Sequence, residues 1–217
     1  MRERFDLRAA LPRLPALIVG LVLFGVGIGL MVQSGLGLGP WEALHQGIAG
    51  RTGIPIGTVS VLLGIPILAL WWPLGERPGL GTILNVMIIG TSTNLAIALL
   101  PAAQVVTGQA AMMVGGVGVI GFGSGLYLSA DLGPGPRDGL MTGVHHRFGW
   151  SIRRARTAIE LTVLAIGWVL GGTIGLGTIV FALGIGPTVQ FWLRIVDREG
   201  RAGRRRAPLV AEGAIGE

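Results

Sequence analysis

The sequence predicts an all-α membrane protein in which six transmembrane helices form two inverted-topology three-helix repeats, each with a short amphipathic or re-entrant helix. Three observations predict this class. The 217 residues are 51% hydrophobic and only 13% charged, whereas soluble domains are about a quarter charged. Six segments are long and apolar enough to cross a bilayer. Finally, one long stretch of the chain occurs twice.

The duplication relates residues 20–90 to residues 116–186 at a constant offset of 96, and 26 of the 71 aligned positions are identical. Glycine is the most frequent residue at the identical positions, and the segment GLGTI at 79–83 occurs again at 175–179. Each copy holds three expected membrane crossings. An odd number of crossings inserts the second copy upside down, which is the plan of many transporters.

The six crossings follow from runs of about 20 apolar residues, the length that spans the hydrocarbon core as a helix. The second and the fifth are short, and the fifth contains Glu160. We expect them near residues 15–33, 57–74, 80–100, 111–130, 157–173 and 176–196.

The arginines predict the orientation. All 17 basic residues are arginines, and six crossings with an inside N-terminus leave only Arg51 outside. Such a bias is the positive-inside pattern, and a five- or seven-helix count would split the clusters. We therefore expect a multi-pass membrane protein with both termini in the cytoplasm.

The domain boundaries follow the repeat. Residues 1–14 are expected to form a cytoplasmic N-terminal tail, residues 15–106 the first membrane repeat and residues 107–197 the second. Residues 198–217 are rich in arginine, alanine and glycine, and we expect a disordered cytoplasmic tail.

A Leu-Gly-x-Gly-Pro segment follows the first helix of each repeat. Its glycines permit a sharp turn with unusual dihedral angles, and its proline suits the first position of a helix. An acid in the first turn then complements the helix dipole. The residues of this pattern are Gly37, Gly39, Pro40 and Glu42 in the first repeat and Gly133, Gly135, Pro136 and Asp138 in the second.

Each proline opens a helix over 40–52 or 136–148, which is too short to cross a bilayer. The apolar stripes expected to bury these helices are Trp41, Leu44 and Ile48, and then Leu140, Val144 and Phe148. Two interpretations stay open. The helices are interfacial connectors, or they are re-entrant half-helices whose amide-rich N-termini line a central site. In the second case Arg137 joins the candidate substrate or coupling site.

Glu160 is the only acid well inside an expected transmembrane helix, and an intramembrane carboxylate is a functional candidate by default. Arg156 lies one turn earlier, so a structural ion pair is the alternative. Among the polar residues, Asn85, Asn94 and Gln190 are expected to tie helices together. The twin threonines Thr82 and Thr178 are expected to bond back to carbonyls of their own helices.

Other chemistry lacks sequence support. The chain has no cysteine and three histidines, whose spacing matches no metal motif, and it has neither a nucleophile elbow nor a Walker loop. We expect no catalytic activity, no metal and no cofactor. The net charge of +6 lies in loops and tails without a basic-aromatic surface motif, so we expect no nucleic-acid partner.

Three segments of the chain carry a family resemblance: "LGLGPWEALHQGIAGRTGIPIGTVSVLLG", "LGPGPRDGLMTGVHHRFGWSIRRARTAIE" and "GTIGLGTIVFALGIGP". Over about residues 14–196 the sequence resembles the YczE/YitT-type family of bacterial membrane proteins. The resemblance implies an inner-membrane protein of five or six helices, and it brings no settled substrate and no catalytic residues. YitT-like members often carry a soluble C-terminal domain, for which this tail is too short. The YczE-like branch therefore fits better.

The leading hypothesis is a small-solute transporter or permease without an ATPase of its own. The alternative is a non-transporting membrane factor or subunit that assists another membrane or secretory system. The expected partners are the lipid bilayer, with anionic headgroups at the cytoplasmic face, and an unknown small solute. A homodimer or a membrane partner is compatible with the glycine-lined helix faces.

Overall fold

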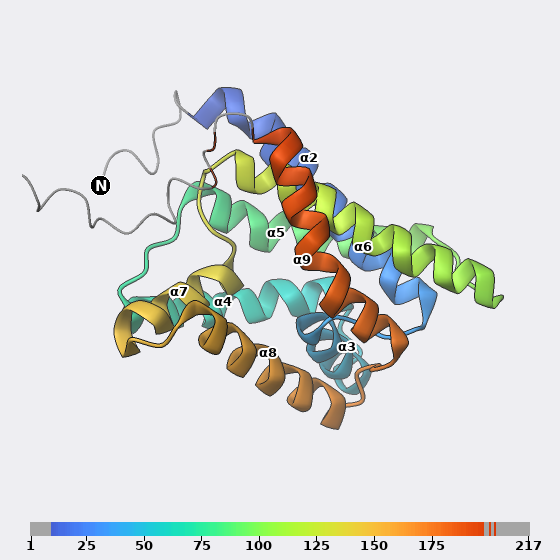
Figure 1. Ribbon diagram of the computed structural model, residues 1–217. Coiled ribbons are helices and arrows are strands. Elements are labelled where there is room, and N and C mark those ends of the chain that lie inside the picture. The colour runs from blue at the N-terminus through green and yellow to red at the C-terminus, as the bar shows by residue number, and fades with distance from the viewer. Residues whose placement is uncertain (1–9, 198–199, 201, 203–217) are drawn as a thin grey trace, which may run out of the picture.

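The computed structural model describes residues 10–197, 200 and 202, and this part of the chain is all α-helical. A short 3-10 helix, η2 (Leu11–Arg13), leads into eight α-helices (Figure 1). These are α2 (Leu14–Ser34), α3 (Pro40–Thr52), α4 (Ile56–Leu74), α5 (Leu80–Leu99), α6 (Val106–Ser129), α7 (Pro136–Phe148), α8 (Ile152–Val169) and α9 (Leu176–Val196). Of the expected tails, residues 1–9 and nearly all of 198–217 lie outside the described residues.

Within the described part of the chain, five helices are long and apolar enough to cross a membrane: η2 with α2, then α4, α5, α6 and α9. They correspond to five of the six expected crossings. The expected crossing at 157–173 corresponds to α8, which is not among them because Arg153, Arg154, Arg156 and Glu160 lie in its first half. The predicted boundaries of this segment were wrong, since α8 begins at Ile152 and ends at Val169, before Gly171 with its φ of +99°.

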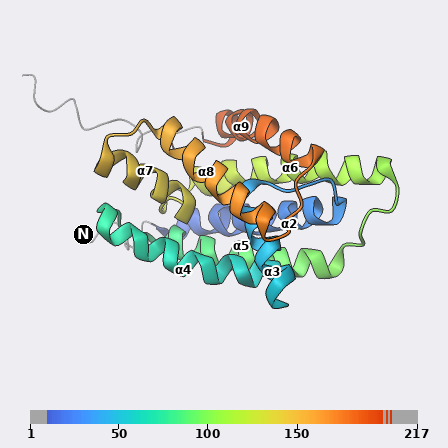
Figure 2. The same ribbon diagram turned by 90° about the horizontal axis from the view of Figure 1, so that it is seen from below.

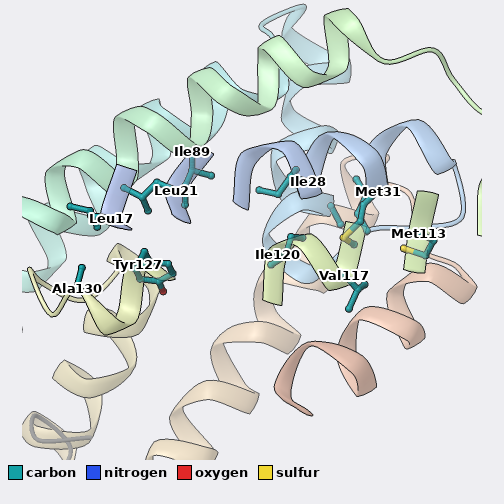
Figure 3. Packing of buried hydrophobic residues seen from close by; sticks show 12 residues of the cluster. Leu17, Leu21, Ile28, Met31, Ile89, Met113, Val117, Ile120, Tyr127 and Ala130 are labelled. Carbon is teal, nitrogen blue, oxygen red and sulfur yellow. The ribbon is translucent and has the colours of Figure 1, made fainter. Parts of the chain in front are cut away.

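The centre of the fold is an antiparallel pair, α2 and α6. A Cβ added to Gly20 would lie 2.6 Å from the carbonyl oxygen of Gly123, and one added to Gly27 would lie 2.8 Å from that of Gly116. The two backbones therefore touch at glycines, as in tightly packed membrane helices. Apolar side chains fill the rest of the crossing, and Figure 3 shows Leu17 and Leu21 opposite Tyr127 and Ala130, with Met31 near Met113 and Val117.

The helices α5 and α9 flank this pair in equivalent ways. Gly25 and Gly29 of α2 face Ser92 and Ala96 of α5. Their counterparts 96 positions later, Gly121 and Gly125 of α6, face Thr188 and Trp192 of α9, which are also 96 positions later. The offset seen in the sequence thus recurs in the contacts, and the matched glycines mark places where helices approach closely.

The helices α3, α4, α7 and α8 lie together below the central pair in Figure 1, and α3 packs against α8 while α7 packs against α4. The C-terminal end of α4 contacts α7, through Trp71 and Leu74. The C-terminal end of α8 contacts α3 instead, through Gly167 and Leu170. The two helices therefore run in opposite directions, which can be followed in Figure 2.

The turns before α3 and α7 bond to α9 and α5. The amide of Gly177 donates to the carbonyl of Leu36 at 2.8 Å, and the amide of Gly81 donates to that of Leu132 at 2.9 Å. The prediction that Thr82 bonds back to a carbonyl of its own helix was wrong. Its hydroxyl donates to the carbonyl of Pro134 at 2.8 Å and accepts from the amide of Gly79. Thr178 likewise accepts from the amide of Gly175. Both side chains cap helix starts because those first amides have no helical partner.

The outer surface is apolar while the interior is rich in glycine and small residues. Trp72, Trp168, Leu176 and Leu183 are all at least two-thirds exposed. Exposed apolar area of this extent is typical of a surface that another apolar phase covers. The helices α4, α5 and α9 carry much of this surface.

Candidate functional site

A cavity of about 290 Å³ lies where the described helices converge, and every one of the eight α-helices contributes lining residues. Its volume is near the lower end of the range typical of small-molecule sites. Apolar and polar groups share the wall. The polar and charged lining residues are Glu42, His45, Ser60, Asn85, Ser124, Tyr127, Arg137, Asp138, Arg156, Glu160 and Gln190.

The first turns of α3 and α7 meet at this cavity. Gly39 and Gly135 are the N-caps, and the prolines at positions 40 and 136 open the helices, as expected. The prolines and the two residues after each of them line the cavity. Two helix N-termini from distant parts of the chain therefore face one space. Their first-turn amides have no partner within the helix.

An ion pair joins these two turns. Arg137 on α7 donates from Nη1 to Oε1 of Glu42 on α3 at 2.7 Å, and its guanidinium lies 5.0 Å from the ring centroid of Trp41. Glu42 is 2% exposed. The carboxylate oxygen Oε2 of Glu42 and the indole Nε1 of Trp41 are buried, and neither has a hydrogen-bond partner among the described residues. Buried polar groups are nearly always paired, so these two atoms are the exceptional ones in the wall.

Burial raises the pKa of the Glu42 carboxyl, but the Arg137 guanidinium, then His45 and the hydrogen bonds, outweigh burial and hold that pKa below its usual value. His45, one turn later on α3, is also buried. Burial lowers the pKa of His45 to about 3, and the positive charge of Arg137 acts in the same direction against the opposing effect of Glu42. At neutral pH the wall therefore holds an ionised Glu42 beside a neutral imidazole.

Asp138 occupies the position of Glu42 in the second half, but its surroundings differ. The hydroxyl of Tyr127, on α6, lies 3.2 Å from Oδ2 of Asp138. No ion-pair partner of Asp138 is present among the described residues. Asp138 is exposed, so its carboxylate is accessible in the lined space.

Glu160 and Arg156 form the ion pair that the sequence suggested, with Nε to Oε1 at 2.9 Å. Both residues also line the cavity. The structural and the functional alternatives for Glu160 are therefore compatible, since the pair lies in the wall of the candidate site.

The structure separates the predicted glycines by role. Gly37 and Gly133 have the expected unusual dihedrals, with φ of +120° and +135°, but they contact the starts of α9 and α5 and do not line the cavity. For Gly39 and Gly135 the dihedral prediction was wrong, because both have φ of −63°. Gly39 is needed for space, since an added Cβ would lie 2.7 Å from the ring of Phe181.

The predicted apolar stripes were also wrong in part. Trp41 is buried as predicted, but the other buried positions include small residues outside the stripes: Ala43 and Gly47 on α3, and Gly139 and Gly143 on α7. Phe148, expected to be buried, is 63% exposed. Glycine is required at positions 47, 139 and 143 because α8 packs so closely on α3, and α4 on α7, that a larger side chain does not fit.

Several lining residues were missed or assigned other roles by sequence reasoning. Tyr127 is the only tyrosine of the chain, yet nothing in the sequence connects it with Asp138. Asn94 does tie helices together, by bonding to the amide of Gly57 and to Thr58. Asn85 and Gln190, for which the same role was expected, line the cavity.

A family model described as a family of unknown function, DUF6198, matches residues 11–194. The chain belongs to the DUF6198 family. This DUF6198 protein is 42% identical over 182 residues to an uncharacterized protein of Haemophilus influenzae, with 84% of each chain covered. No solved structure matches it.

Two relatives come from Bacillus subtilis. The uncharacterized membrane protein YczE is 36% identical over 177 residues, which cover 80% of this DUF6198 protein and 82% of YczE. The uncharacterized protein YyaS is 26% identical over 192 residues, or 87% and 96% of the two chains. The resemblance to YczE is thereby confirmed. With five helices apolar enough to cross a membrane, this DUF6198 protein is a bacterial multi-pass membrane protein whose helices contact lipid.

Proposed function

We propose that this protein is a small-solute transporter or permease, without an ATPase of its own, that moves its solute through the cavity between α3 and α7. The observation that carries the proposal is the convergence of two equivalent helix starts on one cavity. Glu42 and Arg137 meet there although they are 95 positions apart. Helix N-termini that point at a central site are a recurrent feature of transporters.

The proposed architecture is six crossings in two inverted repeats, residues 15–106 and 107–197, with both termini in the cytoplasm. Three features support it. The central pair α2 and α6 occupies equivalent sequence positions yet runs antiparallel, and so does the pair α4 and α8. In addition, the bonds Gly177 to Leu36 and Gly81 to Leu132 are related by the offset of 96.

In this proposal α8 is the sixth crossing, although its first half is charged. Arg156 and Glu160 line the cavity, and in the proposed orientation Arg153 and Arg154 lie at the cytoplasmic end. Its second half carries the exposed apolar residues Leu161, Ile166 and Trp168. Charged residues inside a membrane commonly face a water-filled cavity and pair with one another.

The helices α3 and α7 are then half-helices that enter from opposite sides. Each is held by the other repeat, because α3 packs against α8 and α7 packs against α4. Arg51 at the end of α3 binds the last carbonyls of α8, at Val169 and Leu170. Rocking of one repeat against the other would change the access to the cavity and strain the Glu42–Arg137 pair that bridges them.

Topology can be tested on this naturally cysteine-free chain by single-cysteine labelling with an impermeant maleimide. Gly50→Cys and His146→Cys occupy equivalent exposed positions, and we expect the first to label only from outside and the second only from inside. Trp150→Cys and Ile174→Cys bracket α8 and should label from opposite sides. Labelling of that pair from one side would reject the sixth crossing.

Function is tested by flux in proteoliposomes across panels of small solutes, with and without a proton gradient. We expect a saturable flux that Glu42→Gln, Asp138→Asn and Glu160→Gln each reduce at least tenfold. Glu76→Gln is the matched control, because Glu76 is an acid outside the cavity wall that pairs with His146. A flux that none of the three variants alters would place transport elsewhere. No flux, with a stoichiometric membrane partner on purification, would favour the alternative of a non-transporting factor.

A further inference from the structure

The cavity wall carries an uneven set of charges. Among the described residues, three carboxylates line it, those of Glu42, Asp138 and Glu160, against two guanidinium groups, those of Arg137 and Arg156. Three minus two leaves one negative charge when His45 is neutral. Clefts lined by an excess of one sign concentrate ions of the opposite sign.

The excess negative charge of the cavity wall lies at Asp138. Glu42 is paired with Arg137, and Glu160 is paired with Arg156, at 2.7 and 2.9 Å. Asp138 is left with the hydroxyl of Tyr127, which is neutral. The carboxylate that lacks a cation is therefore exposed at the cavity, where a solute can reach it.

A second observation also points to a ligand with donors. Oε2 of Glu42 is a buried carboxylate oxygen in the same wall, and it has no donor among the described residues. A buried acceptor without a donor destabilises the folded protein, and it does so more when the group is charged. A protonated amine carries N–H donors and a positive charge, so it can serve both carboxylates, whereas an anion can serve neither.

The apolar part of the wall fits the body of such a solute. Four aromatic side chains line the cavity: Phe24, Trp41, Tyr127 and Phe181. Aromatic faces attract cations as well as apolar groups, and the wall already holds one cation in this way, since Arg137 lies over the ring of Trp41. The N–H of that indole is buried and has no acceptor among the described residues.

We infer that the cavity takes a small organic cation, namely a protonated amine with an apolar or aromatic body, whose ammonium group binds at Asp138. This inference rests on the proposed function for its physiological meaning, but binding can be tested without transport. The solute enters with its charge at the exposed carboxylate and its body among the aromatic rings. Glu42 contributes the second acceptor through Oε2.

The test uses three probes that share one body and differ in charge: benzylamine, benzyl alcohol and benzoate. Their binding to the purified full-length protein in detergent is measured by calorimetry at pH 7. We expect benzylamine to bind at least tenfold more tightly than benzyl alcohol, and benzoate to bind least. Benzyltrimethylammonium, which keeps the charge but has no N–H donor, should bind more weakly than benzylamine.

Variants locate the site. Asp138→Asn should weaken benzylamine binding at least tenfold and leave the affinity for benzyl alcohol unchanged. Glu76→Gln, which also replaces a carboxylate by an amide but lies outside the cavity, should alter neither affinity. Thermal unfolding shows whether each variant is folded. Benzoate binding above benzylamine, no benzylamine binding to folded protein, or an unaffected Asp138→Asn would each overturn the inference.

The two proposals fail in different ways. Amine binding without any flux in proteoliposomes would reject transport and leave the cation site standing. Flux of a neutral or anionic solute, without amine binding, would reject the cation site and leave transport standing.

Discussion

Arg137 lies over the ring of Trp41, with its guanidinium carbon 5.0 Å from the ring centroid, and the two residues occupy the same position in the two halves of the sequence. Their neighbours Glu42 and Asp138 are equivalent in the same sense. The halves therefore meet at matching points, and each contributes a different side chain there. The two helix starts share the Gly-Pro pattern but form an asymmetric site, with the Glu42–Arg137 ion pair on one side and a carboxylate bonded to the Tyr127 hydroxyl on the other.

The Glu42–Arg137 pair should be strongly coupled. Its side chains are 3% and 26% exposed, and breaking a buried pair by removing one partner costs about 3–5 kcal/mol. A double-mutant cycle of Glu42→Gln and Arg137→Gln, measured by unfolding in detergent, should give a coupling well above that of Glu160→Gln and Arg156→Gln. The latter pair is one helical turn apart and more exposed, so its coupling should be about 0.2–0.5 kcal/mol. Equal couplings would contradict the burial of the first pair.

The crossing of α2 and α6 should not tolerate a methyl group. An alanine Cβ at Gly123 would lie 2.5 Å from the carbonyl oxygen of Gly20, and overpacking of this kind costs about 1–3 kcal/mol. Gly118→Ala, on the same helix, is the control because nothing lies within 4 Å of the added carbon. It should keep or raise the unfolding temperature, which intrinsic fluorescence measures. A harmless Gly123→Ala would mean that the helices lie farther apart.

Trp71 should limit what residue 139 can be. The Trp71 ring, which is fully buried, occupies the place that a Cβ on Gly139 would take, and its Nε1 donates to the carbonyl of Pro136 at 3.0 Å. Gly139→Ala should therefore destabilise the protein by about 1–3 kcal/mol. Adding Trp71→Phe should recover part of that loss, because the smaller ring leaves room for the methyl group. Additive effects in the double variant would show that the two residues are not in contact.

His45 should make the protein less stable as the pH falls. Its pKa is about 3 in the folded protein against 6.5 for the free side chain, so between these values the unfolded chain holds a proton that the folded protein does not. Stability must then fall as the pH drops below about 6.5. Between pH 6.5 and 5 the loss should approach about 2 kcal/mol, at 1.36 kcal/mol per pH unit.

The measurement is the unfolding temperature as a function of pH in detergent. His45→Gln should flatten the slope between pH 6.5 and 5. Below pH 4.5 a further loss of stability should remain in that variant, because the pKa of Glu42 is lowered below 4.5 and protonation then breaks its pair with Arg137. A slope between pH 6.5 and 5 that persists in His45→Gln would contradict the assignment.

Local chemistry in the sequence was enough for much of the fold. Runs of apolar residues predicted five of the helices within a few positions, because hydropathy and length are properties of a segment alone. Proline and glycine placed the ends of the short helices, since α3 runs from Pro40 to its cap at Gly53 and α7 from Pro136 to its cap at Gly149. The first-turn acids were found for the same reason. Most of the candidate residues that surround these starts do line the cavity.

Partners distant in the chain were decided only by the tertiary structure. The sequence alone could not bring Tyr127 to Asp138, assign Thr82 to the carbonyl of Pro134, or show that Gly39 is required by the ring of Phe181. These contacts depend on how helices from the two halves cross, which no single segment encodes. The sequence determined where most of the helices begin, though not α6 or α8, and how apolar each helix is. The packing of α3 against α8 and of α7 against α4 decided which side chains share the cavity, because burial and charge pairing depend on the neighbours that the fold supplies.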